Sequence, residues 1–142
     1  MKTFSKFLNE AEEMYDNNYS DVSALSEGAF FGSLQESVVI VWQAHLKTDS
    51  YAVHMATNEF YEEMLEKVDS LIETYQGEHD KVDMYTNIVK MQSDDLIQYL
   101  ENLQAITEKG REAFCDSTAL ESCCDDVLGL ISTTLYKLKE LS

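Results

Sequence analysis

Two histidines and two carboxylates are spaced along the chain in a way that suits a metal ion. His45 and His54 lie nine positions apart, and Asp69 and Glu73 follow with a helical spacing of four. Imidazole nitrogens and carboxylate oxygens together are ligands for iron or zinc. The four residues are therefore a candidate metal set. The alternative is that the acids form a solvated helix face and the histidines hydrogen-bond at an interface.

One copy of the chain is not expected to close this site. Asp69 follows His54 by 15 positions, roughly 22 Å at 1.5 Å per residue of helix. An antiparallel partner helix, related by a twofold axis near residue 62, would bring the two histidines of one subunit to the two carboxylates of the other. The stripe between the two ligand groups is then expected at the interface: Asn58, Tyr61 and Leu65.

The elements that must position these residues are helices. The sequence has no proline and five glycines, and its 44% of hydrophobic residues is enough for a core. Apolar residues at helical spacing predict helices over 26–47, 51–76, 93–109 and 118–142. Residues 1–25 read as a polar lead-in and 26–142 as one all-α four-helix bundle, whose connection over 78–92 holds a short helix around 82–89.

Local signals predict where these helices begin and end. Gly77 and Gly110 are expected just past two helix ends, and Thr118 with Glu121 is expected to form a capping box. The predicted core stripe of the first helix includes Trp42. The remaining expected core positions are Phe31, Leu34, Val38, Val41, Val53, Phe60, Met64, Val68, Leu71, Tyr75, Leu96, Leu100, Leu103, Leu120, Cys124, Val127, Ile131, Leu135 and Leu138.

Charge and cysteine usage exclude some function classes. Ten Lys and Arg against 27 Asp and Glu give a net charge of −17, which disfavours direct binding to nucleic acids or anionic membranes. No apolar run approaches the length that spans a bilayer. Cys115, Cys123 and Cys124 lack zinc-site spacing and are expected to be core residues. We therefore expect a protein of a reducing cytosol.

The candidate metal residues carry a family resemblance. The run HLKTDSYAVH over 45–54, followed by DSLIE over 69–73, resembles the Dps-like miniferritins and, with YQG over 75–77, a ferritin-like group from bacteriophages. The resemblance implies a ferritin-like bundle assembled from twofold dimers, up to a cage. It also implies a metal site of His45, His54, Asp69 and Glu73 shared between subunits, with iron, or zinc in its place, and ferroxidase-like oxidation of Fe(II).

Two positions depart from the miniferritin pattern. Trp42 stands where the first miniferritin histidine falls in an ungapped comparison, and Asn58 stands where an additional aspartate ligand falls. The lysine-rich tail by which some Dps proteins hold DNA is absent, so that function is not implied.

The start of the chain carries a second resemblance. MKTFSKFLNEA over 1–11 resembles the capsid-targeting leaders of T-even-like phages, which are cut after a Leu-x-Glu such as Leu8-Asn9-Glu10. The leading expectation is a phage-associated iron-binding protein in the bacterial host cytoplasm or inside the virion. The alternatives are a non-enzymatic structural protein of the virion, with capsid proteins as partners, and a helical inhibitor whose acidic surface imitates nucleic acid.

Overall fold

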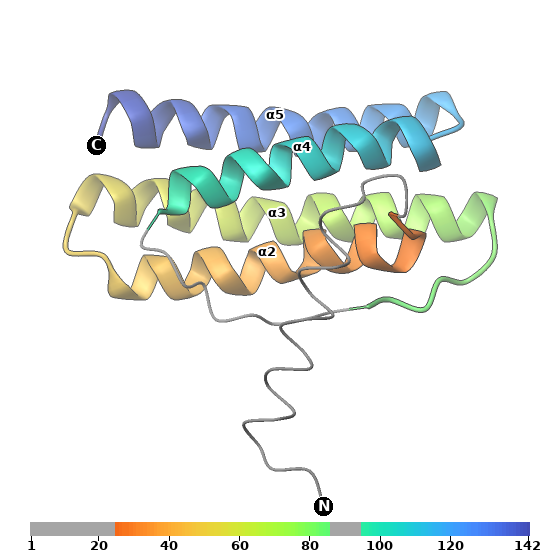
Figure 1. The fold of residues 1–142 in the computed structure, drawn as a ribbon, viewed down its shortest axis with the longest axis horizontal. Helices are drawn as coiled ribbons and strands as arrows, with labels where there is room; N and C mark the ends of the chain where they lie inside the picture. Colours follow the sequence, from red (N-terminus) through yellow and green to blue (C-terminus); the bar gives the residue numbers. More distant parts are fainter. Residues whose placement is uncertain (1–24, 86–94) are drawn as a thin grey trace, which may run out of the picture.

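The computed structural model describes residues 25–85 and 95–142, and over these ranges the chain forms four α-helices and no strand (Figure 1). The helices are α2 (Glu27–Lys47), α3 (Tyr51–Glu78), α4 (Leu96–Phe114) and α5 (Thr118–Glu140). The predicted all-α, four-helix arrangement is thus confirmed. In the described ranges, no helix combines the length and the apolar character needed to cross a membrane.

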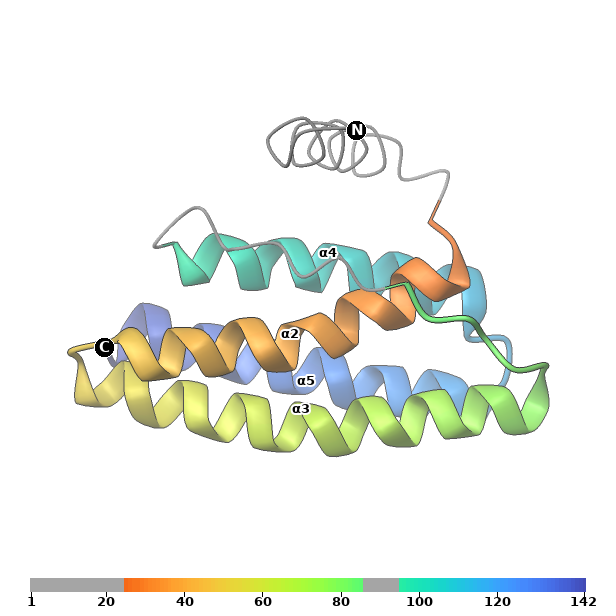
Figure 2. The same cartoon turned by 90° about the horizontal axis from the view of Figure 1, so that it is seen from below.

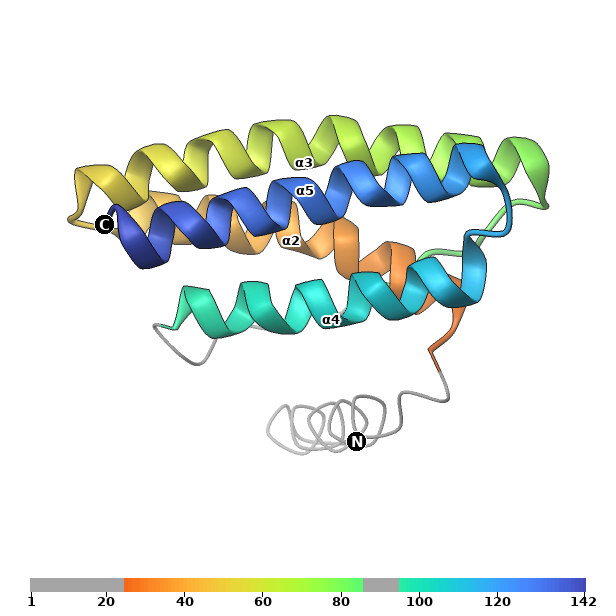
Figure 3. The same ribbon diagram turned by 90° about the horizontal axis from the view of Figure 1, so that it is seen from above.

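The four helices pack in a ring around one core. α2 lies against α3 and α4, and α5 lies against the same two helices, so α2 and α5 are diagonally opposite each other (Figures 2 and 3). Short links make α2 antiparallel to α3 and α4 antiparallel to α5. α3 and α4 run in the same direction, so the end of α3 and the start of α4 lie at opposite ends of the bundle (Figure 1). The topology is therefore up, down, down, up with one crossover.

Each helix begins at a side chain that accepts a hydrogen bond from the first turn. Ser26, Ser50, Asp95 and Ser117 accept from the backbone N–H three positions on, at 3.1 to 3.3 Å. Such caps satisfy one of the free amides at a helix start. The predicted capping box of Thr118 with Glu121 is wrong, because Ser117 is the cap and its third following residue is Leu120.

Two glycines predicted to end helices lie inside them. α3 continues past Gly77 to Glu78, and α4 continues past Gly110 to Phe114. Neither glycine has a positive φ angle, the backbone geometry that makes glycine a helix terminator. Gly110 is instead a close-packing position, because a side chain there would overlap the ring of Phe30.

The core follows the predicted stripes with two kinds of exception. Val38, Val53 and Leu96 are only partly buried, and Trp42 is 49% exposed. Trp42 directly follows the fully buried Val41, so it sits about 100° further round the helix and faces outward. The stripe on α5 is buried along its whole predicted length.

The chain after α3 lies directly on α2. The Tyr85 N–H donates to the Gly28 carbonyl at 3.0 Å, and a side chain at Gly32 would overlap the backbone of Tyr85. Residues 82–85 are not helical, so the predicted short helix is absent over that part. The rest of that prediction, residues 86–89, lies outside the described residues, as do residues 1–24 with the predicted leader and cleavage point.

Candidate metal centre

His45 and His54 form a reciprocal pair at one end of the bundle. His45 lies in the last turn of α2 and His54 in the first turn of α3, joined by the short link over 48–50. Their rings stack with centroids 3.7 Å apart and planes 25° apart. Nδ1 of His45 lies 2.9 Å from the carbonyl oxygen of His54, and Nδ1 of His54 lies 3.1 Å from the carbonyl oxygen of His45. The short link thus brings both imidazoles together at this end of the bundle.

This pairing fixes which ring nitrogens carry protons. A carbonyl oxygen only accepts hydrogen bonds, so each Nδ1 must donate, and in a neutral ring each Nε2 then keeps its lone pair. Among the residues that the structure describes, neither Nε2 has a hydrogen-bond partner. His45 is only 7% exposed. In the described chain every fully buried side-chain nitrogen has a hydrogen-bond partner. Nε2 of His45 has none, so this atom must be in contact with solvent. The Nδ1 hydrogen bonds therefore fix both rings, and the Nε2 atom of each ring is available to bind a metal.

Polar and aromatic side chains of α3 contact the histidine pair. The buried Thr57 hydroxyl donates to the Val53 carbonyl at 2.7 Å and lies 3.4 Å from Nδ1 of His45. Tyr61 meets the His45 ring edge-on at 5.3 Å between centroids, and its hydroxyl donates to Oδ1 of Asn58 at 3.1 Å. Asn58 therefore has its amide oxygen engaged by Tyr61, one turn along α3 from His54.

Asp69 and Glu73 lie far along the same helix and do not meet the histidines in one chain. α3 is continuous over 51–78, so the separation of roughly 22 Å between His54 and Asp69 holds. Both carboxylates are exposed, and neither makes an ion pair or hydrogen bond within residues 25–85 and 95–142. The structure thus brings together two of the four predicted ligands.

An exposed apolar surface lies between the two ligand groups. On α3 it includes Tyr61 and Leu65, which is 61% exposed, and on α2 it includes Trp42 and Leu46, which is 68% exposed. Trp42 and Tyr61 are in contact across the two helices, with ring centroids 6.0 Å apart. Sequence reasoning missed the α2 half of this surface, although the spacing of four between Trp42 and Leu46 could have identified it.

A second cluster, absent from the sequence expectations, lies at the far end of α3. The ligand atoms of Glu78, His79 and Asp116 all lie within 4.8 Å of one another, and they form the single group of three His, Cys, Asp or Glu found in the described part of the chain. The sequence pattern does not predict this cluster, because Asp116 follows His79 by 37 positions and approaches it only through the α4–α5 turn.

In this second cluster both ring nitrogens of His79 already have hydrogen-bond partners. Nε2 of His79 lies 3.0 Å from Oδ2 of Asp116, and Nδ1 lies 3.2 Å from the Tyr75 carbonyl. Both partners are acceptors, so this arrangement favours the protonated ring, in which both nitrogens donate. The Asp116 hydrogen bond accordingly raises the pKa of His79 above its ordinary value. Ser117 donates to Glu78 at 2.7 Å, so this cluster is an ion-paired clamp between α3 and the α4–α5 turn.

Comparison with known proteins gives one match. Residues 45–138, more than half of the chain, match the family model described as "Family of unknown function (DUF5856)". The matched range begins at His45 and contains His54, Asp69 and Glu73. No curated protein and no solved structure matches the chain.

Proposed function

The chain belongs to the DUF5856 family of unknown function, and we propose that it is a ferritin-like protein that binds iron between twofold-related copies. Each dimer has two equivalent sites. The ligands of each site are His45 and His54 of one copy with Asp69 and Glu73 of the other.

The observation that carries this proposal is the reciprocal hydrogen bonding of His45 and His54. Histidine ligands of metals commonly donate the second ring N–H to a carbonyl or carboxylate, which orients the ring and fixes the tautomer. Here both rings have that outer partner, at 2.9 and 3.1 Å, and both Nε2 atoms remain available.

The missing ligands point to a second copy of the chain. No third His, Cys, Asp or Glu lies within ligand range of the pair among the described residues. An antiparallel α3 from a second copy, crossing near residue 62, would place the unpaired Asp69 and Glu73 beside it. Trp42, Tyr61 and Leu65 would then be covered by the partner.

The chemistry of the donor set fits iron. Imidazole with carboxylate suits iron and zinc, whereas a thiolate-rich set would favour zinc. The net charge of −17 raises the local concentration of cations around the site. Iron bound there supplies one-electron chemistry with peroxide or dioxygen. The chain's own residues hold the imidazoles, supply the carboxylates and, through Trp42 and Tyr61, restrict water at the interface.

The topology supports a ferritin-like assignment. Bundles with one long crossover between the second and third helices are typical of ferritin-like folds, whereas simple up-and-down bundles have only short links. Here α3 and α4 run in the same direction, so the link between them must be of the crossover kind (Figure 1). The phage setting of the proposal rests on the sequence resemblance alone, since the leader lies outside the described residues.

A complementation experiment tests the shared site. His54→Asn and Asp69→Asn variants of the full chain are titrated with Fe(II) without oxygen, first alone and then after mixing and reassociation. Each variant alone should lose the tight sites. A mixed dimer regains one intact site, so about a quarter of the wild-type sites should return. No return on mixing, with both proteins dimeric, would overturn the shared site.

The second cluster supplies the control. His79→Ala removes the ring of the ion-paired clamp and should leave the tight Fe(II) sites unchanged. Equal losses for His79→Ala and His54→Asn would place iron binding at the exposed cluster or at nonspecific acidic positions, and the proposed function would be wrong.

A further inference from the structure

A fully buried hydroxyl lies between the two helices that carry the histidine pair. Thr57 belongs to α3 and has no exposed surface. Its Oγ1 atom lies 2.7 Å from the carbonyl oxygen of Val53 and 3.1 Å from that of His54. The same atom lies 3.4 Å from Nδ1 of His45 on α2. One hydroxyl of α3 is therefore within hydrogen-bond distance of the ring that α2 contributes to the pair.

The direction of the hydroxyl proton follows from these partners. A threonine hydroxyl has one proton to donate, and a carbonyl oxygen can only accept. The proton of Thr57 is therefore directed to the backbone carbonyls of α3, of which Val53 is the nearest. The oxygen of Thr57 then presents a lone pair toward Nδ1 of His45. An acceptor at this place requires that Nδ1 carries the proton.

The two histidines are consequently held to different degrees. Nδ1 of His45 has two acceptors, the His54 carbonyl at 2.9 Å and the Thr57 hydroxyl oxygen at 3.4 Å. Nδ1 of His54 has the His45 carbonyl at 3.1 Å. The ring of His45 is also the more buried of the two and meets Tyr61 edge-on. Thr57 thus adds a constraint to His45 that His54 does not share.

We propose that Thr57 positions His45 as a metal ligand. This role rests on the proposed function. The hydroxyl oxygen holds the proton on Nδ1 and fixes the rotation of the ring, so that Nε2 is the atom presented to the metal. Thr57 does not touch the metal and acts only through His45. Outer partners of ligating histidines typically change metal affinity about 10–100-fold when they are removed.

Two substitutions separate the hydroxyl from the shape of the side chain. Thr57→Val replaces the hydroxyl by a methyl group of similar size, so the core stays filled while Nδ1 of His45 loses its second acceptor. Thr57→Ser removes the methyl group and keeps the hydroxyl. A role in positioning therefore predicts that serine restores what valine loses.

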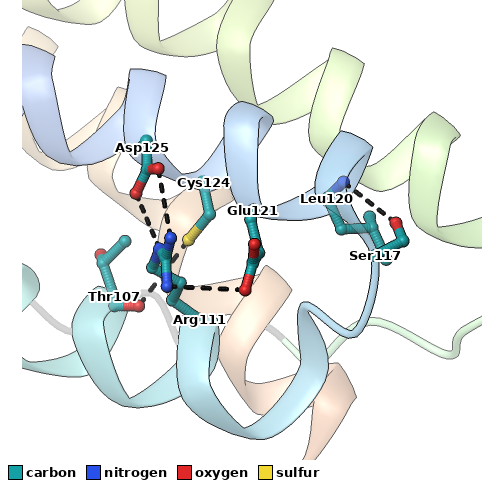
Figure 4. Close-up of polar contacts among 7 residues, drawn as sticks. All are labelled: Thr107, Arg111, Ser117, Leu120, Glu121, Cys124 and Asp125. Atoms are coloured by element: carbon teal, nitrogen blue, oxygen red, sulfur yellow. Dashed lines mark hydrogen bonds and ion pairs between the residues drawn. The ribbon is translucent and has the colours of Figure 1, made fainter.

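Thr107 provides the matched control. It is also fully buried, and its hydroxyl donates to the Leu103 carbonyl at 2.7 Å, as the Thr57 hydroxyl does to Val53. It lies on α4 beside Cys124 of α5, whose thiol is 3.8 Å from the Thr107 carbonyl (Figure 4). Thr107→Val removes the same kind of buried bond without a histidine as its partner. Effects that come only from a buried hydroxyl should be equal for both threonines.

The first measurement uses the metal-free full chain, labelled with ¹⁵N, at mildly alkaline pH where histidine rings are neutral. The chemical shifts of the ring nitrogens report which nitrogen of His45 carries the proton. Wild type, Thr57→Ser and Thr107→Val should show the proton on Nδ1. Thr57→Val should show a measurable fraction with the proton on Nε2.

The second measurement is a titration of the same proteins with Fe(II) without oxygen. Thr57→Val should bind about 10-fold more weakly than wild type, whereas Thr57→Ser and Thr107→Val should stay close to wild type. An unchanged tautomer in Thr57→Val, with no greater loss of affinity than in Thr107→Val, would overturn the proposal. A wild-type chain that binds no iron would overturn the proposed function, and the tautomer of His45 would then decide by itself whether Thr57 positions the ring.

Discussion

The ring of Phe30 on α2 lies directly over Gly110 on α4. A Cβ atom built on Gly110 would overlap three atoms of that ring, and Phe30 has no exposed surface. Phe30 also stacks on Phe114, one turn further along α4, with centroids 5.7 Å apart. The contact between these two helices therefore depends on the absence of a side chain at one position.

Gly110→Ala should destabilise the fold although alanine is the better helix former. Overpacking of a filled core costs roughly 1–3 kcal/mol. Gly129→Ala is the control, because Gly129 lies within α5 with no atom near its Cβ position, and removing a helical glycine should stabilise by about 0.5–1 kcal/mol. Urea unfolding followed by circular dichroism measures both. Equal stability of the two variants would contradict the close packing at Phe30.

The same glycines explain where prediction of the fold from sequence stops. The helices and most core positions follow from apolar spacing, because burial imposes that period on each helix. Glycine commonly terminates helices, so the sequence alone predicts helix ends at Gly77 and Gly110. Whether a glycine ends a helix or accepts a neighbouring ring depends on a contact 80 positions away in the chain, at Phe30, and no local pattern contains that information.

The geometry of the candidate site could likewise be predicted only in part from the sequence. The sequence places His45 and His54 on either side of a short link over 48–50, and such a link can bring both imidazoles to the same end of the bundle. Spacing does not show that each Nδ1 binds the other residue's carbonyl, which depends on how α2 ends and α3 begins. The clamp of His79 with Asp116 was not predictable, because it requires the register of α3 against the α4–α5 turn.

The clamp of His79 with Asp116 should make stability depend on pH. The Asp116 hydrogen bond, opposed by desolvation and aided by the Tyr75 carbonyl, raises the pKa of His79 in the fold. The folded state therefore holds the proton more tightly than the unfolded state does. The resulting stabilisation is complete below the ordinary histidine pKa of about 6.5 and disappears as pH rises through the folded value.

Asp116→Asn should remove that dependence. The difference in unfolding free energy between wild type and Asp116→Asn is expected to be largest near pH 5 and smallest near pH 8, by urea titration at each pH. Asp126→Asn removes the same charge from an exposed position of α5, and its difference from wild type should lack this decline. A difference for Asp116→Asn that grows with pH would show that the pair does not act through the His79 proton.

The two roles of His54 should be separable by two substitutions. The amide nitrogen of Asn occupies nearly the position of Nδ1, so His54→Asn can still donate to the His45 carbonyl, whereas His54→Ala cannot. His54→Ala should lose about 1 kcal/mol of stability, the usual value of such a hydrogen bond, and His54→Asn should lose less. Both should lose tight Fe(II) binding. Retained binding in His54→Asn would show that Nε2 is not a ligand.

The last prediction concerns self-association through the surface of Trp42, Leu46, Tyr61 and Leu65. In the proposed dimer Leu65 lies close to the twofold axis, so Leu65→Lys would bring two like charges together and remove apolar burial from both copies. The variant should shift from dimer toward monomer in sedimentation, with weaker iron binding in parallel. Tyr136→Lys is the control, because Tyr136 is 56% exposed against 61% for Leu65 but belongs to α5, which contributes no residue to the proposed interface. It should leave assembly unchanged. A monomeric Leu65→Lys protein that still binds iron as tightly as wild type would refute the shared site while leaving the four-helix fold intact.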